Sequence, residues 1–168
     1  MKSMADPTEA ERAALAAINK ASDPKVLRNL IANARRLGSE RVMKAAFSRL
    51  CEVQPTALPG SLEHDVWQSI FALEEMISGE RGKTVRLSRT RQKISRDGER
   101  RTVSDLALKA TPSDGFYDLV QRGYPELTFE AVVLRHPQEF DDQTIAAARL
   151  RLSDAGLNPD IVSPAHGA

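Results

Sequence analysis

Apolar residues recur at three- and four-residue steps between strong helix-capping signals, and this pattern constrains the fold of the chain more than any other feature. Thr8 and Glu11 have the spacing of a capping box, in which each side chain accepts a hydrogen bond from the other residue's backbone amide. Asp23 precedes Pro24, which places a capping carboxylate ahead of a proline at the first helical position. The pattern predicts that residues 8–53 are helical.

Two of these helices are separated by a very short connection. Gly38 can adopt the left-handed conformation that ends a helix, and Ser39 can cap the next helix at once. Because so short a link brings two amphipathic helices side by side, we expect residues 23–53 to form an antiparallel helical hairpin.

Proline and glycine in residues 55–60 interrupt the helical pattern and mark the clearest boundary in the chain. We expect an N-terminal helical region, residues 1–54, and a second helical region, residues 61–157. Residues 158–168 are rich in proline, alanine and glycine, and we expect them to form a flexible tail. The fold class is therefore predicted to be mainly α, a bundle of about seven or eight short helices.

Composition excludes several classes of protein. The chain has 168 residues, 41% hydrophobic and 28% charged, which is typical of globular domains. Its single cysteine, Cys51, excludes an internal disulfide framework and favours a reducing compartment. No apolar run approaches the ~20 residues of a membrane span, and the N-terminus lacks the apolar core of a signal peptide. We expect a cytoplasmic protein without membrane contact, and we interpret the composition as bacterial.

Positive charge is concentrated in residues 81–101. This segment has nine basic and two acidic residues and so carries +7, whereas the net charge of the chain is only +1. The other 147 residues must then carry 1 − 7 = −6. The basic residues are Arg81, Lys83, Arg86, Arg89, Arg91, Lys93, Arg96, Arg100 and Arg101.

Two local structures fit this basic segment. Residues 88–94 can form a short capped helix after a loop, which would place Arg89, Lys93 and Arg96 on one side. Asp97-Gly98 is also a legitimate two-residue turn for a basic β-hairpin. We favour the loop and short helix and keep the hairpin as the alternative.

The density of cations favours nucleic-acid binding as the function. Neutralising several phosphates releases counterions, and this release supplies most non-specific affinity for DNA. If six or more of these cations meet phosphates, we expect a log–log dependence of affinity on salt with a slope on the order of −5. DNA is the favoured ligand, and no catalytic residue is expected. The predicted contacts are Arg86, Arg89, Arg91, Gln92, Lys93, Arg96, Arg100 and Arg101, with Gln121 and Arg122 in a secondary role.

Residues 102–123 have the proportions of a helix-turn-helix, and the resemblance is to this motif class alone. A first helix would begin at Thr102, and a second would be capped by Ser113 or Asp114 and carry Gln121 and Arg122. The turn lacks the common glycine, and the acidic residues of the second helix would face phosphate. The basic segment, rather than a recognition helix, is therefore expected to make the contacts.

A protein–protein adaptor is the first alternative function. The hairpin of residues 23–53 would offer a groove, and the basic patch would meet an acidic partner. Homo-oligomerisation is equally compatible with the sequence.

A metal-dependent nuclease is the second alternative, because such a centre needs only a few convergent carboxylates. The histidines and Cys51 show no metal-ligand spacing, so we expect no resident metal and no cofactor. The candidate carboxylates are Glu74, Glu75, Glu126, Glu130, Asp141 and Asp142.

Overall fold

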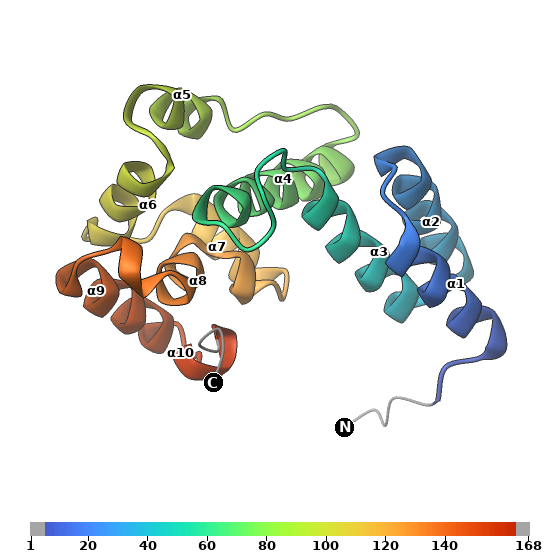
Figure 1. The fold of residues 1–168 in the computed structure, drawn as a ribbon. Coiled ribbons are helices and arrows are strands. Elements are labelled where there is room, and N and C mark those ends of the chain that lie inside the picture. The colour runs from blue at the N-terminus through green and yellow to red at the C-terminus, as the bar shows by residue number, and fades with distance from the viewer. Residues whose placement is uncertain (1–5, 164–168) are drawn as a thin grey trace. The chain divides into compact units, whose positions relative to one another are not determined.

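The computed structural model describes residues 6–163, and within this range the chain forms helices and no strand (Figure 1). The predicted mainly-α fold is confirmed. The helices are α1 (Glu9–Lys20), α2 (Pro24–Leu37), α3 (Glu40–Val53), α4 (Leu62–Arg81), α5 (Ser88–Asp97), α6 (Glu99–Leu108), α7 (Asp114–Gln121), α8 (Phe129–Arg135), α9 (Asp142–Asp154) and α10 (Pro159–Val162), with short 3-10 helices η1 (Pro125–Leu127) and η2 (Pro137–Glu139).

Most helices begin at the residues that the sequence predicts. Thr8 and Glu11 form the complete capping box of α1, and the Asp23 side chain accepts from the amide of Lys25 at the start of α2. Ser39 caps α3 directly after Gly38, whose φ of 72° is left-handed. These caps satisfy amide groups that have no partner inside their helices, which fixes where each helix starts.

The chain divides into two compact units between Thr56 and Ala57. In the first unit, α2 and α3 pack together as a hairpin, and α1 packs on α3. Their shared core contains Ile18, Leu27 and Leu50, each at most 1% exposed. Burial of each such side chain contributes roughly 1.5–3 kcal/mol. The apolar face of the hairpin is therefore covered in part by α1.

The second unit is built around α4, which packs against α6, α7 and α8, while α9 packs on α6 and α8 (Figure 1). Its core is aliphatic, and Val66, Ile70, Val103, Val132 and Leu152 are all fully buried. This unit contains the whole basic segment.

The basic segment forms a loop followed by two helices, so the β-hairpin alternative is wrong. The predicted turn at Asp97-Gly98 does exist, but it joins α5 to α6 instead of two strands. Gly98 has a φ of 83°, a conformation that side-chain-bearing residues rarely adopt. Helix α6 begins at Glu99, three residues before the predicted cap Thr102. Thr102 is buried within the helix, and its hydroxyl has no hydrogen-bond partner among residues 6–163.

The segment after α9 is more ordered than its composition indicates. Asn158 caps the short helix α10, which packs on α8 and α9. The Ser163 hydroxyl donates a 2.8 Å hydrogen bond to the carbonyl of Ala131. The expected flexible tail, residues 158–168, is therefore helical in part, and its residues 164–168 lie outside the described range.

Candidate nucleic-acid interface

Glu74 organises the first part of the basic segment. Its side chain on α4 is only 6% exposed and accepts two 2.7 Å hydrogen bonds from the guanidinium of Arg91. The same carboxylate accepts a 2.8 Å bond from the amide of Leu87, which fixes the loop where it enters α5. Arg86 Nη1 lies 3.6 Å from Glu74 Oε2, and the Arg86 side chain remains 59% exposed.

Arg91 thus has a structural role. Its guanidinium lies 5.0 Å from the ring centroid of Trp67 and 5.4 Å from that of Phe71, within cation–π range. The hydrogen bonds to Glu74 raise the pKa of Arg91 above its ordinary value. A side chain held on a carboxylate and two rings is not available to a phosphate without breaking this arrangement.

A second network joins α5 to α6. The Lys93 ammonium donates to Asp97 at 2.9 Å and to Asp105 at 2.7 Å. Arg96 also binds Asp97, and Arg101 binds Asp105, each at 2.9 Å. Hydrogen bonds from Arg96 and Lys93 hold the pKa of Asp97 far below its ordinary value, and the bond from Lys93 chiefly lowers that of Asp105.

These partners reduce the charge that the segment presents. Arg100 lies 3.6 Å from Glu139. The carboxylates from outside residues 81–101 that pair with cations of the segment are thus Glu74, Asp105 and Glu139. The local charge falls from +7 to 7 − 3 = +4. Within residues 6–163, the segment's cations without an ion pair are Arg81, Lys83 and Arg89, and all three are exposed.

Of the other predicted nucleic-acid contacts, the two glutamines are exposed and Arg122 is held by carboxylates. Gln92 and Gln121 are exposed, on α5 and at the end of α7. Arg122 binds Glu80 through two hydrogen bonds of 2.7–2.8 Å and Asp118 through a third of 2.9 Å. The bonds to Glu80 are the main reason that the pKa of Arg122 lies above its ordinary value. The structure therefore gives Arg122 a bridging role between α4 and α7.

The predicted helix-turn-helix does not have the packing of that motif. The main partners of α6 are α9, α5, α8 and α4, whereas α7 packs on α4 and η1. In a helix-turn-helix the first helix packs across the second, which it holds in the DNA groove. Residues 102–123 instead contribute two helices to a common core.

Three of the six carboxylates named for a nuclease centre form other contacts. Glu74 binds Arg91, Glu130 binds Arg151 at 2.9 Å, and Asp141 caps α9. In the part of the chain that the structure describes, no three histidine, cysteine or acidic side chains are grouped to hold a metal ion.

A buried polar cluster around Asp65 could not be seen in the sequence. His136 Nε2 lies 2.8 Å from Asp65 Oδ2, Arg135 donates to the same oxygen at 3.1 Å, and His64 Nδ1 is 3.6 Å from Oδ1. Burial alone would raise the pKa of Asp65, but the His136 hydrogen bond and the Arg135 charge outweigh it, so the pKa is lowered. The cluster joins the start of α4 to the end of α8.

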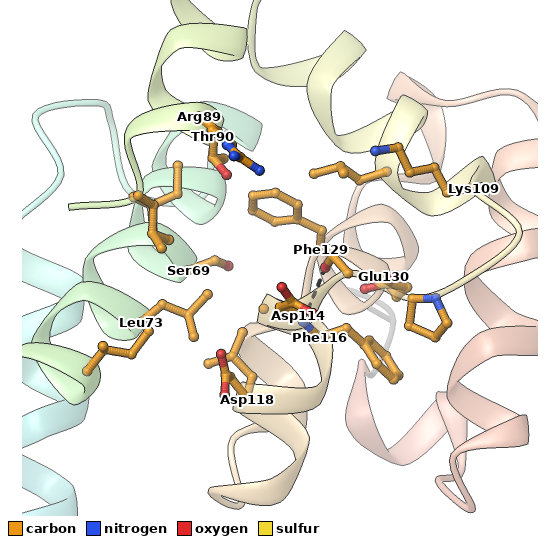
Figure 2. A pocket seen from close by; sticks show the side chains of 18 of the residues that line it. Ser69, Leu73, Arg89, Thr90, Lys109, Asp114, Phe116, Asp118, Phe129 and Glu130 are labelled. Atoms are coloured by element: carbon orange, nitrogen blue, oxygen red, sulfur yellow. Dashed lines mark hydrogen bonds between the residues drawn. The ribbon is translucent and has the colours of Figure 1, made fainter. Parts of the chain in front are cut away.

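A cavity of about 650 Å³ lies beside the basic loop, among α4, α5, α7 and α8. Figure 2 shows Arg89 and Thr90 on one side, Lys109 on another and the ring of Phe129 between them. Burial raises the pKa of Glu130, which also lines the cavity, although Arg151 opposes this effect. The lining residues come from four separate stretches of chain, so no local pattern indicates the cavity.

Comparisons of this chain with models of protein families, with curated proteins and with solved structures found no match. Among the described residues, no helix is both long and apolar enough to cross a membrane.

Proposed function

We propose that this protein binds nucleic acid, with DNA the favoured ligand, through the exposed cations at the junction of α4 and α5. The observation that supports the proposal is the contrast within the basic segment. Arg81, Lys83 and Arg89 are exposed and have no ion pair in the described range, and Arg86 is 59% exposed with only a 3.6 Å contact. Phosphate groups can bind these side chains without displacing a carboxylate.

The paired cations are less suitable contacts. To bind phosphate, Arg91 or Lys93 would first have to leave carboxylates 2.7–2.9 Å away. The predicted interface therefore narrows from the whole segment to Arg81, Lys83, Arg86 and Arg89. With three or four phosphate contacts, the expected log–log salt slope becomes about −3 instead of −5.

This binding role accounts for the structure better than an adaptor does. The adaptor alternative uses a groove on the α2–α3 hairpin together with the basic patch, and Ile18 of α1 is buried against that hairpin. Among the described residues, Arg81, Lys83 and Arg89 have no ion pair, and Arg86 has only its 3.6 Å contact with Glu74. They are the feature that a polyanion would satisfy.

A matched pair of triple variants tests the proposal. One replaces Arg81, Lys83 and Arg89 with alanine, and the control replaces Arg96, Arg100 and Arg101, so both lose three positive charges. Binding to a fluorescent DNA duplex and to its single strand is measured by anisotropy from 50 to 300 mM salt. Circular dichroism checks that each variant is folded.

We expect the first triple variant to lose at least about tenfold in affinity and most of the salt slope, because each phosphate contact contributes about 0.9 to that slope. The control should keep most of both. Equal losses in the two variants would show that only net charge matters, and absence of binding by the wild-type protein to either DNA would refute the function.

A further inference from the structure

The cavity beside the basic loop has the size and lining of a small-molecule site. Its volume of about 650 Å³ falls within the roughly 300–1,000 Å³ of ligand pockets. One wall is aliphatic, with Leu73 and Ile77 from α4 and Leu119 from α7, and Phe129 stands inside it (Figure 2). An apolar body of ligand size would therefore be desolvated there.

The charged groups at the cavity are not balanced. Asp118 is held by Arg122 and Glu130 by Arg151, and both arginines lie outside the lining. Arg89 and Lys109 line the cavity, are exposed and form no ion pair among the described residues. Two cations therefore remain available to a ligand.

Few carboxylates of the cavity lining are free to oppose these cations. Asp114 is the lining carboxylate without an ion pair in the described range. Arg86, also in the lining, keeps most of its surface exposed despite its 3.6 Å contact with Glu74. The lining thus favours a negative group near Arg89 over a positive one.

The start of α5 strengthens this preference. Leu87, Ser88, Arg89 and Thr90 all line the cavity. Leu87 is the N-cap residue of α5 and has no polar side chain to bond the amides of the first turn, although its own amide donates to Glu74. The free amides of a first helical turn favour an anion, although they only add to the effect of the arginine beside them.

From the aliphatic wall and the excess of lining cations over lining carboxylates without an ion pair, we propose that the cavity binds a small amphipathic anion: an aliphatic body with one carboxylate or phosphate group. The anionic group would bind Arg89, and the body would contact Leu73, Ile77 and Phe129. This cavity and the proposed nucleic-acid surface would bind different ligands, although Arg89 belongs to both.

Calorimetric titration of the full chain with decanoate and with decyl phosphate tests the proposal and identifies the preferred head group. Decyltrimethylammonium has the same tail with a positive head, and adenosine monophosphate has the phosphate without the aliphatic tail. We expect at least one decyl anion to bind and both of these comparison compounds to bind at least about tenfold more weakly, since each lacks one of the two recognised parts.

Arg89→Ala should weaken binding of the decyl anion by about tenfold, the effect of losing one hydrogen bond to a charged group. Arg100→Ala is the matched control, because Arg100 is 67% exposed and does not line the cavity. Equal affinity for the ammonium and anionic ligands, tighter binding of the nucleotide, equal loss in the two variants, or no binding of either decyl anion would overturn the site. None of these results bears on DNA affinity.

Discussion

Residues 81–89 carry four cations and residues 90–101 carry five, yet the two stretches differ in where their charges lie. In the second stretch, Arg91, Lys93, Arg96 and Arg101 lie 2.7–2.9 Å from carboxylates. Arg100 is the exception, because its contact with Glu139 is 3.6 Å, as long as that of Arg86 with Glu74. In the first, only Arg86 has an ion pair among the described residues, and its partner is 3.6 Å away. Similar charge density in sequence therefore gives one stretch whose cations mostly pair with carboxylates of the fold and one whose cations are mostly open to a ligand.

The difference follows from helix geometry. Residues four apart lie on the same face of a helix, so Lys93 meets Asp97 and Arg101 meets Asp105 without any tertiary structure. The stretch before α5 is a loop for most of its length and has no such periodicity. Its cations are paired only where the loop passes a carboxylate of α4.

Among the variants that test this difference between the two stretches, Glu74→Ala should reduce the stability of the fold most. The change would leave the Arg91 guanidinium, only 27% exposed, without its carboxylate and would remove the acceptor of the Leu87 amide. Because breaking a buried pair leaves an uncompensated charge, we expect a loss of about 3 kcal/mol in the free energy of unfolding, measured by urea denaturation.

The control for this variant is Glu63→Ala, at an exposed position in the first turn of the same helix. Its loss should be about 0.3–1 kcal/mol, the usual effect of an acidic side chain at a helix N-terminus. A similar small loss for Glu74→Ala would mean that the pairing of Arg91 does not hold the loop in place.

A smaller effect is expected for Asp97→Asn, and it should depend on pH. Because Arg96 and Lys93 lower the folded-state pKa of Asp97, its ionised form stabilises the fold above the ordinary carboxyl pKa. This contribution decreases as the pH falls below about 4, since the unfolded chain then takes up the proton first. The stability difference between wild type and variant should therefore be larger at pH 7 than at pH 3.

Urea midpoints at the two pH values measure this change. In a Lys93→Met background the narrowing should be weaker, because one of the two hydrogen-bond donors to Asp97 is gone. A difference that is constant between pH 7 and pH 3 would contradict the pairing of Asp97 in solution.

The sequence predicts the helices well because their signals are local. Thr8, Ser39, Ser61 and Asp141 each bond an amide two or three residues away, so the caps can be recognised without tertiary structure. The same reasoning fails at Thr102, because α6 begins three residues earlier, at Glu99, with Gly98 as its N-cap residue. A capping pattern alone does not distinguish a helix start from a buried position within a helix.

The candidate site is predicted less well because its partners are distant in the chain. Glu74 lies 17 residues from Arg91, and Asp105 lies 12 from Lys93. Only the pairs at four-residue spacing, such as Arg101 with Asp105, had a signal in the sequence. Counting charges in residues 81–101 therefore overestimates the charge presented to a ligand.

Arg89→Ala should have the smallest effect on stability. It directly tests whether the cations of residues 81–89 are open to a ligand, unlike the paired cations of residues 90–101. Since Arg89 is exposed, has no ion pair in the described range and lies among other cations, its removal takes away no attraction and relieves some repulsion. We expect the free energy of unfolding to change by less than about 0.5 kcal/mol, measured by urea denaturation at low and high salt. Any gain should shrink at high salt, which already screens the repulsion. A loss above about 1 kcal/mol would instead show that Arg89 is held within the fold. Arg89 would then resemble Arg91, which must leave a partner within the fold before it can bind a ligand. Neither the nucleic acid nor the amphipathic anion would then find a freely available cation at this position.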